Sequence, residues 1–319
     1  MKKIRLALLS GGISSEREVS LNSGRQVFDA LDKNRYDIAQ YDPKTDLKKL
    51  VTDAESIDAA LIILHGPFGE DGTVQGLLDL LDIPYQGAGV LGSAIAMNKR
   101  VSKKLFETAQ IPIPAYFSFS MNDTIDIPEI TGALGLPLVV KPACAGSSVG
   151  MTIVKNGKDL KAAVDLAFTH DDTILIETYI KGIELTCGVL GNDTLEALPL
   201  IEIIPGEGYE FFDYTAKYTA GATREICPAR IDEAITKKAQ ELAVKAHQAL
   251  YLKGYSRTDM ILSGKNLFVL ETNTIPGMTA TSLYPQSAQA AGLSFTELLD
   301  RLIDLAMAEH EKTKLRRSK

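Results

Sequence analysis

Four polar side chains between residues 257 and 273 have the types and spacing of a metal and anion site. They lie in two apolar runs, RTDMIL and LFVLETN, and the short Gly-containing segment between the runs predicts a β-hairpin. In a hairpin centred on Lys265, Asp259 lies opposite Glu271, and Arg257 lies opposite Asn273. Two facing carboxylates repel each other, but Mg²⁺ prefers such oxygen ligands and keeps room for phosphates. We therefore predict metal ligation by Asp259, Glu271 and Asn273, with Arg257 facing an anion; a solvated strand face is the alternative.

This stretch also resembles a known family. R-x-D followed by E-x-N-x-x-P-G-M-T and S-L is similar to the end of ATP-grasp ligases and, more narrowly, of the D-alanine:D-alanine ligases. The resemblance implies an α/β protein with an N-terminal parallel-sheet, Rossmann-like domain and a two-lobed ATP-grasp fold. It implies two Mg²⁺ ions, or Mn²⁺, on ATP at the three ligands named above. It further implies an oxyanion site at Arg257 and the Gly277 N–H, and binding of the second substrate's carboxylate by Ser282 and Leu283.

Length, composition and charge narrow the class of protein. A chain of 319 residues is long enough for two or three domains, and 45% hydrophobic with 24% charged residues is ordinary for a soluble protein. The net charge of −7 argues against nucleic-acid binding. Three widely spaced cysteines argue against a disulfide framework or a cysteine zinc site and fit the cytoplasm. The apolar run in MKKIRLALLSGG is short for a signal peptide, and no segment predicts a membrane span.

We expect a first α/β domain over residues 1–96, beginning with a strand, a glycine turn and a helix. Ser15 and Glu18 have the spacing of a capping box at the start of that helix. Ligands of α/β sheets bind at such strand ends, and Glu16 is left to face the crevice or to complement the helix dipole. GGISSEREVS matches the ligase family closely. The resemblance implies that Glu16 holds the ammonium group of the first D-alanine.

A second strand of this domain, in DAALIILHG, ends at His65 and a glycine-rich turn. A lone histidine is more often structural than functional, but His65 stands at a strand end, where site residues collect. H-G-x-x-G-E-D-G-x-x-Q resembles the ligase signature and implies that His65 lies near the first substrate. We expect Glu70 and Asp71 to support the loop. The first strand lacks the G-x-G-x-x-G of an NAD-binding domain.

Residues 97–180 are expected to form the central lobe, which covers ATP. Lys99 lies near a helix start, where a cation is unfavourable unless an anion such as phosphate sits opposite. Lys141 ends a strand and precedes a loop of small residues whose amides could approach phosphates. The loop lacks the G-K-[ST] of a Walker A motif. K-P-x-x-x-G-S-S-x-G resembles the flap over ATP in the family and implies that Ser147 reaches Glu16 and Tyr218.

The stretch DTILIETYIKGIELTCGVL joins the two ATP-grasp lobes. The family resemblance implies that Glu177 accepts from the adenine amino group and that Tyr179 and Ile180 present their backbone to the ring. It places Glu184 at the ribose hydroxyls. On residue type alone, both glutamates would more often be exposed strand residues.

We assign residues 181–319 to the C-terminal lobe. Its aromatic segment near residues 205–225 has no strand or helix period, which favours a lid or a packed surface loop. The resemblance implies that Lys217 and Tyr218 approach the second substrate there. A tyrosine at 218 favours a second substrate that carries an amine.

Together these patterns predict an ATP-dependent ligase of cell-wall (peptidoglycan) precursor synthesis that joins two D-alanines through a D-alanyl phosphate and releases ADP and phosphate. The predicted partners are D-alanine and ATP, and the family resemblance implies a cytoplasmic homodimer. A sister ligase using D-serine or D-lactate is the nearest alternative. A nucleotide-dependent binding or sensor protein on the same scaffold is an alternative from another class.

Overall fold

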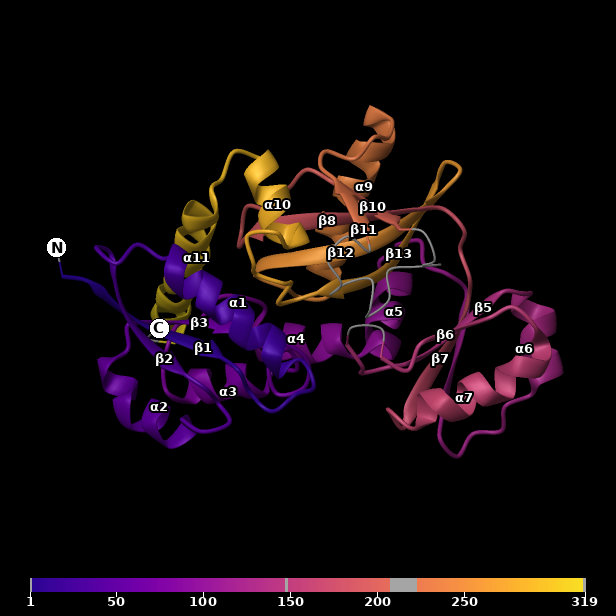
Figure 1. Ribbon diagram of the computed structural model, residues 1–319, viewed down its shortest axis with the longest axis horizontal. Helices are drawn as coiled ribbons and strands as arrows, with labels where there is room; N and C mark the ends of the chain where they lie inside the picture. The colour runs from indigo at the N-terminus through magenta and orange to yellow at the C-terminus, as the bar shows by residue number, and fades with distance from the viewer. Residues whose placement is uncertain (1, 147–148, 207–222, 318–319) are drawn as a thin grey trace.

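The computed structural model describes residues 2–146, 149–206 and 223–317. Its strands form one parallel and two antiparallel sheets, with helices packed on them (Figure 1). This mixed α/β architecture agrees with the prediction from the sequence. Within the described ranges, no helix is both long and apolar enough to cross a membrane.

The N-terminal sheet is parallel and has the strand order β2-β1-β3. Its strands are β1 (Ile4–Ser10), β2 (Tyr36–Tyr41) and β3 (Ala59–Ile63), and the neighbouring helices are α1 (Arg17–Ala30), α2 (Leu47–Asp53) and α3 (Thr73–Leu80), with a 3-10 turn at Ala54–Ser56. The strands β1 and β3 are almost wholly apolar and buried, because helices cover both faces of the sheet. The loops that follow β1 and β3 are tied together by a 2.7 Å hydrogen bond from the Ser14 hydroxyl to the His65 carbonyl.

Helix α11 (Phe295–Arg317) returns to this first sheet from the far end of the chain (Figure 1). Leu298, Leu299, Leu302 and Ile303 are fully buried and share one hydrophobic core with β1 and β3. The Tyr36 hydroxyl donates a 2.6 Å hydrogen bond to Asp300 on the same helix. The predicted boundaries 1–96, 97–180 and 181–319 stay a prediction, but the last helix of the third range packs with the first domain.

Helices α4 (Gly89–Met97) and α5 (Lys99–Thr108) lead into the second sheet. This sheet is antiparallel with the order β4-β7-β5-β6, formed by β4 (Tyr116–Ser120), β5 (Leu138–Pro142), β6 (Thr152–Val154) and β7 (Thr173–Thr178). Helices α6 (Ile127–Leu134) and α7 (Leu160–Phe168) pack their apolar faces on it and close its core. A 3-10 turn at Gly157–Asp159 precedes α7.

The third sheet is antiparallel with the order β11-β10-β8-β12-β13, and β9 pairs with β8. Its strands are β8 (Ile183–Gly191), β9 (Glu196–Ala197), β10 (Ile201–Pro205), β11 (Thr223–Ile226), β12 (Gly254–Ser263) and β13 (Asn266–Asn273). Helix α9 (Glu233–Ala249) packs its buried alanines and Leu242 against Met260 and Leu262 of β12. Helix α10 (Leu283–Ala290) follows the hairpin.

The hairpin of β12 and β13 has the predicted pairing where it matters for the site. Arg257 is opposite Asn273 and Asp259 is opposite Glu271. The turn itself differs from the prediction, because Ser263 pairs with Asn266 and only two residues form the turn. A bulge at Leu270 of β13, opposite the step from Asp259 to Met260 of β12, shifts the register by one residue on the way to the site.

Candidate active site

A cavity of about 840 Å³ is lined by many of the residues to which the sequence assigned chemical roles. It lies between the loops after β1 and β3, the start of α5, the site end of the hairpin and the start of α10. Nine predicted residues line it: Glu16, His65, Lys99, Arg257, Glu271, Asn273, Gly277, Ser282 and Leu283. Residues far apart in the sequence are therefore brought to one cavity.

Glu16 sits at the N-cap position of α1, with 7% of its surface exposed. The predicted capping box of Ser15 and Glu18 is wrong, because the helix begins at Arg17, and the Glu16 amide donates a 3.2 Å hydrogen bond to the Ser14 hydroxyl oxygen. A Cβ atom on Gly66 would approach the Glu16 Oε2 to 2.9 Å, and one on Gly146 to 3.0 Å. Glycine at both positions lets two loops close around this carboxylate.

His65 and Glu70 surround the same end of the cavity. Burial lowers the pKa of His65, although the Glu16 carboxylate opposes the shift, so the imidazole is neutral at neutral pH. Its Nε2 is buried without a hydrogen-bond partner in the described part of the chain. Glu70 accepts a 2.6 Å hydrogen bond from the Gly66 amide, which supports its predicted role in the loop. Burial, followed by repulsion from Glu16, raises the pKa of Glu70 to about 8.

The hairpin carries a saturated carboxylate. Asp259 Oδ1 accepts from the Thr186 hydroxyl at 2.6 Å and from Arg257 Nε at 2.9 Å. Its Oδ2 accepts from the Arg257 guanidinium at 2.8 Å and from the Asn273 amide at 3.1 Å. An ionised carboxylate has about four lone-pair sites, so these contacts fill Asp259. Burial alone would lower the pKa of Arg257. The charge and hydrogen bonds of Asp259 outweigh that effect and raise the pKa above its ordinary value.

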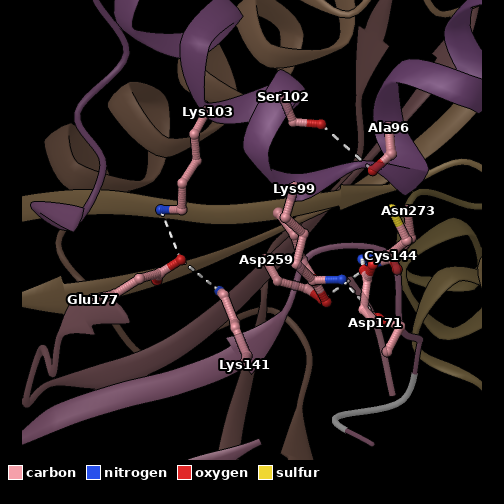
Figure 2. Close-up of polar contacts among 12 residues, drawn as sticks. Ala96, Lys99, Ser102, Lys103, Lys141, Cys144, Asp171, Glu177, Asp259 and Asn273 are labelled. Atoms are coloured by element: carbon pink, nitrogen blue, oxygen red, sulfur yellow. Dashed lines mark hydrogen bonds and ion pairs between the residues drawn. The ribbon is translucent and has the colours of Figure 1, made fainter. Parts of the chain in front are cut away.

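Lys99 stands beside Asp259 (Figure 2), and it is paired with Glu271. Lys99 Nζ lies 3.3 Å from Glu271 Oε2 and donates a 2.8 Å hydrogen bond to the Ala145 carbonyl. Two carboxylates and one amide form a set of hard oxygen donors that suits Mg²⁺. A metal at Asp259 has to displace one of its present donors, and Asn273 has to turn its amide oxygen inward. The oxygen atoms of Asp259, Glu271 and Asn273 therefore suit the ion, provided that Asp259 gives up one of its present hydrogen bonds.

The segment before α10 supplies hydrogen-bond donors at the opposite wall. Ser282 is the N-cap of α10, and the first amides of a helix favour a bound carboxylate. The Ser282 hydroxyl contacts the Thr279 hydroxyl at 2.7 Å and accepts from the Thr279 amide at 3.1 Å. A Cβ on Gly277 would lie 3.0 Å from Ser282 Oγ, so glycine keeps the two close.

A second, smaller cavity of about 150 Å³ opens between the second and third sheets. All six predicted nucleotide residues line it: Lys99, Lys141, Glu177, Tyr179, Ile180 and Glu184. Apolar side chains, among them Val139, Met151 and Leu270, line the rest and suit a flat ring. Lys99 and Glu271 line both cavities, so the two spaces meet at the metal-type residues.

Two independent family models match this chain. The model described as the N-terminus of D-Ala–D-Ala ligase matches residues 40–88, and the model of its C-terminus matches residues 105–304. The chain is 63% identical to the D-alanine–D-alanine ligase of Syntrophobacter fumaroxidans, over 97% of this chain and 99% of that protein. The chain belongs to the D-alanine–D-alanine ligase family. It is thus a ligase.

Other members of the family extend the comparison. The D-alanine–D-alanine ligase of Desulfotalea psychrophila is 52% identical, over 98% of this chain and 97% of the relative. A ligase of the same name from Bacillus anthracis, solved in complex with ATP, superposes with a TM-score of 0.86 at 34% identity, covering 97% of this chain and 99% of that one. A D-Ala:D-Ser ligase from Enterococcus faecalis has a TM-score of 0.82 at 36% identity, covering 96% and 100%. These likenesses confirm the predicted ATP-grasp fold.

Three predicted residues of this ligase lie outside the described ranges: Ser147, Lys217 and Tyr218. Conversely, the sequence reading missed Lys103, which is 1% exposed and lies 3.2 Å from Glu177. Its position four residues after Lys99 places both lysines on one face of α5 and was the available signal.

Proposed function

We propose that this ligase joins two D-alanines with ATP through a D-alanyl phosphate. The carboxylate of the first D-alanine attacks the γ-phosphorus and ADP leaves. The amine of the second D-alanine then attacks the acyl carbonyl, and the tetrahedral intermediate expels inorganic phosphate and yields the dipeptide. The product supplies peptidoglycan precursor synthesis.

Glu16 orients the first substrate. Its buried carboxylate, enclosed by two glycine loops, is suited to an ammonium group that has left water. The neutral His65 stands beside it with an unmatched Nε2, so the imidazole hydrogen-bonds the same substrate without repelling its ammonium.

Arg257 and the Gly277 N–H stabilise the oxyanion that forms at the acyl carbon. Both line the larger cavity, as Glu16 does. The carboxylate of the second D-alanine lies at the start of α10, where Ser282 and the Leu283 amide receive it. This placement directs its amine back toward the acyl phosphate.

Asp259, Glu271 and Asn273 would hold two Mg²⁺ ions, or Mn²⁺ in their place. The bound ions would offset the charge of the ATP phosphates. Arg257 now donates to both oxygens of Asp259, the carboxylate that would serve as a metal ligand.

The smaller cavity takes the nucleotide. Lys99 and Lys141 contact its phosphates, where positioning and charge compensation are the main needs of phosphoryl transfer. Glu177 accepts from the adenine amino group, the backbone at Tyr179 and Ile180 borders the ring, and Glu184 takes the ribose. Ser147, Lys217 and Tyr218 are proposed, from the sequence, to close the site against water.

The observation that carries this proposal is the junction of the cavities at Lys99 and Glu271. A nucleotide in the smaller cavity would therefore lie next to the space that Glu16, Arg257 and the start of α10 border. The test is phosphate release from ATP and Mg²⁺ with D-alanine, L-alanine, or D-alanine plus D-serine or D-lactate, with products identified by mass.

Release with D-alanine alone, together with the D-alanyl-D-alanine mass, supports the proposal. Release that requires D-serine or D-lactate moves the function to a sister ligase. No release with any pair favours the nucleotide-dependent binding protein. We also propose a cytoplasmic homodimer, as the family resemblance implies; light scattering and cell fractionation test the two statements.

A further inference from the structure

A buried lysine outside both cavities holds the glutamate of the nucleotide pocket. Lys103 projects from α5 into the interior, is 1% exposed and does not line the smaller cavity. Its Nζ lies 3.2 Å from Glu177 Oε1 and 5.1 Å from the centre of the Tyr116 ring. Burying an ammonium is costly unless a charge is paired with it, so this position requires Glu177 to be ionised.

Lys141 approaches the same carboxylate from the other side (Figure 2). Its Nζ is 3.0 Å from the same Oε1, but Lys141 lines the cavity and is 9% exposed. One carboxylate thus has two lysine partners, of which only one reaches the nucleotide space. A phosphate group can recruit Lys141, whereas Lys103 is too deeply placed to follow.

We infer that Lys103 is a positioning residue that keeps Glu177 charged and directed at the nucleotide when Lys141 turns from Glu177 to the phosphates. Without Lys103, the departure of Lys141 would leave a buried carboxylate unpaired, which is strongly unfavourable. Glu177 would then either retain Lys141 or take up a proton. A retained Lys141 would be lost to the phosphates, and a protonated Glu177 would be a weaker acceptor, so both changes weaken nucleotide binding. A protonated Glu177 can also donate a hydrogen bond, which changes the base edge that it prefers.

The backbone supports this division of labour. Glu177 lies on β7 between Tyr116 of β4 and Val139 of β5, so its Cα position is held by both neighbouring strands. The two lysines come from different elements, α5 and β5. Lys141 can therefore rearrange while the contact between Lys103 and Glu177 persists.

The test compares Lys103→Met with Lys104→Met, an exposed neighbour on the same helix. Phosphate release at saturating D-alanine gives the KM for ATP and for purine riboside triphosphate, which lacks the 6-amino group. Lys103→Met should raise the KM for ATP about tenfold or more and leave the KM for D-alanine unchanged. It should also reduce the preference for ATP over purine riboside triphosphate. Lys104→Met should behave like the wild type. An unchanged ATP preference in a folded Lys103→Met protein overturns the inference.

This inference rests on the proposed adenine contact of Glu177, and Glu177→Met, which removes the acceptor oxygens, separates the two. If Glu177→Met leaves the ATP preference intact, the proposed contact itself fails; if only Lys103→Met leaves it intact, the role of Lys103 fails alone. Should Lys103→Met not fold, the double variant Lys103→Met/Glu177→Met removes both charges. Its ATP preference should equal that of Glu177→Met, and an additional loss would contradict action through Glu177.

Discussion

Glu271 lies directly opposite Asp259 because the hairpin carries one extra residue, Leu270, between the turn and the site. On β13, Leu267 and Val269 are buried in the core. Strict alternation would bury residue 271 next, but the next buried residue is Thr272. After the bulge, the side chains of β13 point to the opposite faces of the sheet from those that strict alternation would give. The side chains of β12 continue to alternate without a break. As a result Leu270 and Glu271 both line the smaller cavity, and the two carboxylates share one face.

Removing the Glu271 carboxylate should abolish turnover without unfolding the protein. A metal site contributes several kcal/mol to such chemistry, so Glu271→Ala should lower kcat/KM by more than about a hundredfold. Its side chain is 28% exposed and faces another carboxylate, so little stability depends on it. Mn²⁺ binding followed by electron paramagnetic resonance with ADP gives a readout apart from turnover. Glu196→Ala, on an exposed position of the same sheet, is the control; near-normal activity of Glu271→Ala would remove the metal assignment.

The Glu16 carboxylate should determine the affinity for the first D-alanine. Loss of a charged hydrogen bond costs about 1.5–3 kcal/mol, so Glu16→Gln should raise the KM of the first D-alanine about ten- to a hundredfold. The KM for ATP should change little. Steady-state kinetics over a wide D-alanine range measure both values. Glu18→Gln alters an exposed residue of the same helix and should be silent; equal kinetics for the two variants would contradict the assignment.

Glu70 should make the folded protein less stable as the pH rises. Burial and Glu16 raise its pKa from an ordinary value near 4.5 to about 8 in the folded state. Between these values the folded protein keeps a proton that the unfolded chain has lost, so the free energy of unfolding falls with increasing pH. Glu70→Gln should remove this contribution, and its stability relative to the wild type should grow between pH 5 and 8. Urea denaturation across this range tests it, with the exposed Glu241→Gln as control; a constant difference would refute the raised pKa.

A buried threonine pair next to the proposed metal ligands should show strong energetic coupling. The hydroxyls of Thr258 and Thr272 lie 3.0 Å apart, and both residues are buried. Thr258→Val leaves the Thr272 hydroxyl without this partner and should cost about 1–3 kcal/mol. The double variant Thr258→Val/Thr272→Val replaces both groups with similar shapes and should regain most of that loss. Chemical denaturation of these two variants, of Thr272→Val and of the wild type completes the cycle, and additive losses would show that the hydroxyls do not interact.

The sequence alone determined the chemical groups of the site and the local elements that carry them. Two apolar runs joined by a short Gly-containing segment predicted the hairpin. Centring it on Lys265 gave the pairing of Asp259 with Glu271, which the structure has because the extra residue Leu270 offsets the shorter turn. The family motifs supplied the predicted roles of Glu16 and the nucleotide residues. The same local signals misplaced the start of α1 and the hairpin turn, since caps and bulges depend on individual hydrogen bonds.

Tertiary structure decided which of these groups meet. Glu16 and His65 reach the cavity of Arg257 only because the first sheet packs beside the third, and α11 joins them by burying leucines against β1 and β3. No short-range pattern records that α5 turns Lys103 toward Glu177 across the second sheet. Residue periodicity reports which face of an element is buried, whereas the partner of a buried charge is set by the packing of whole elements.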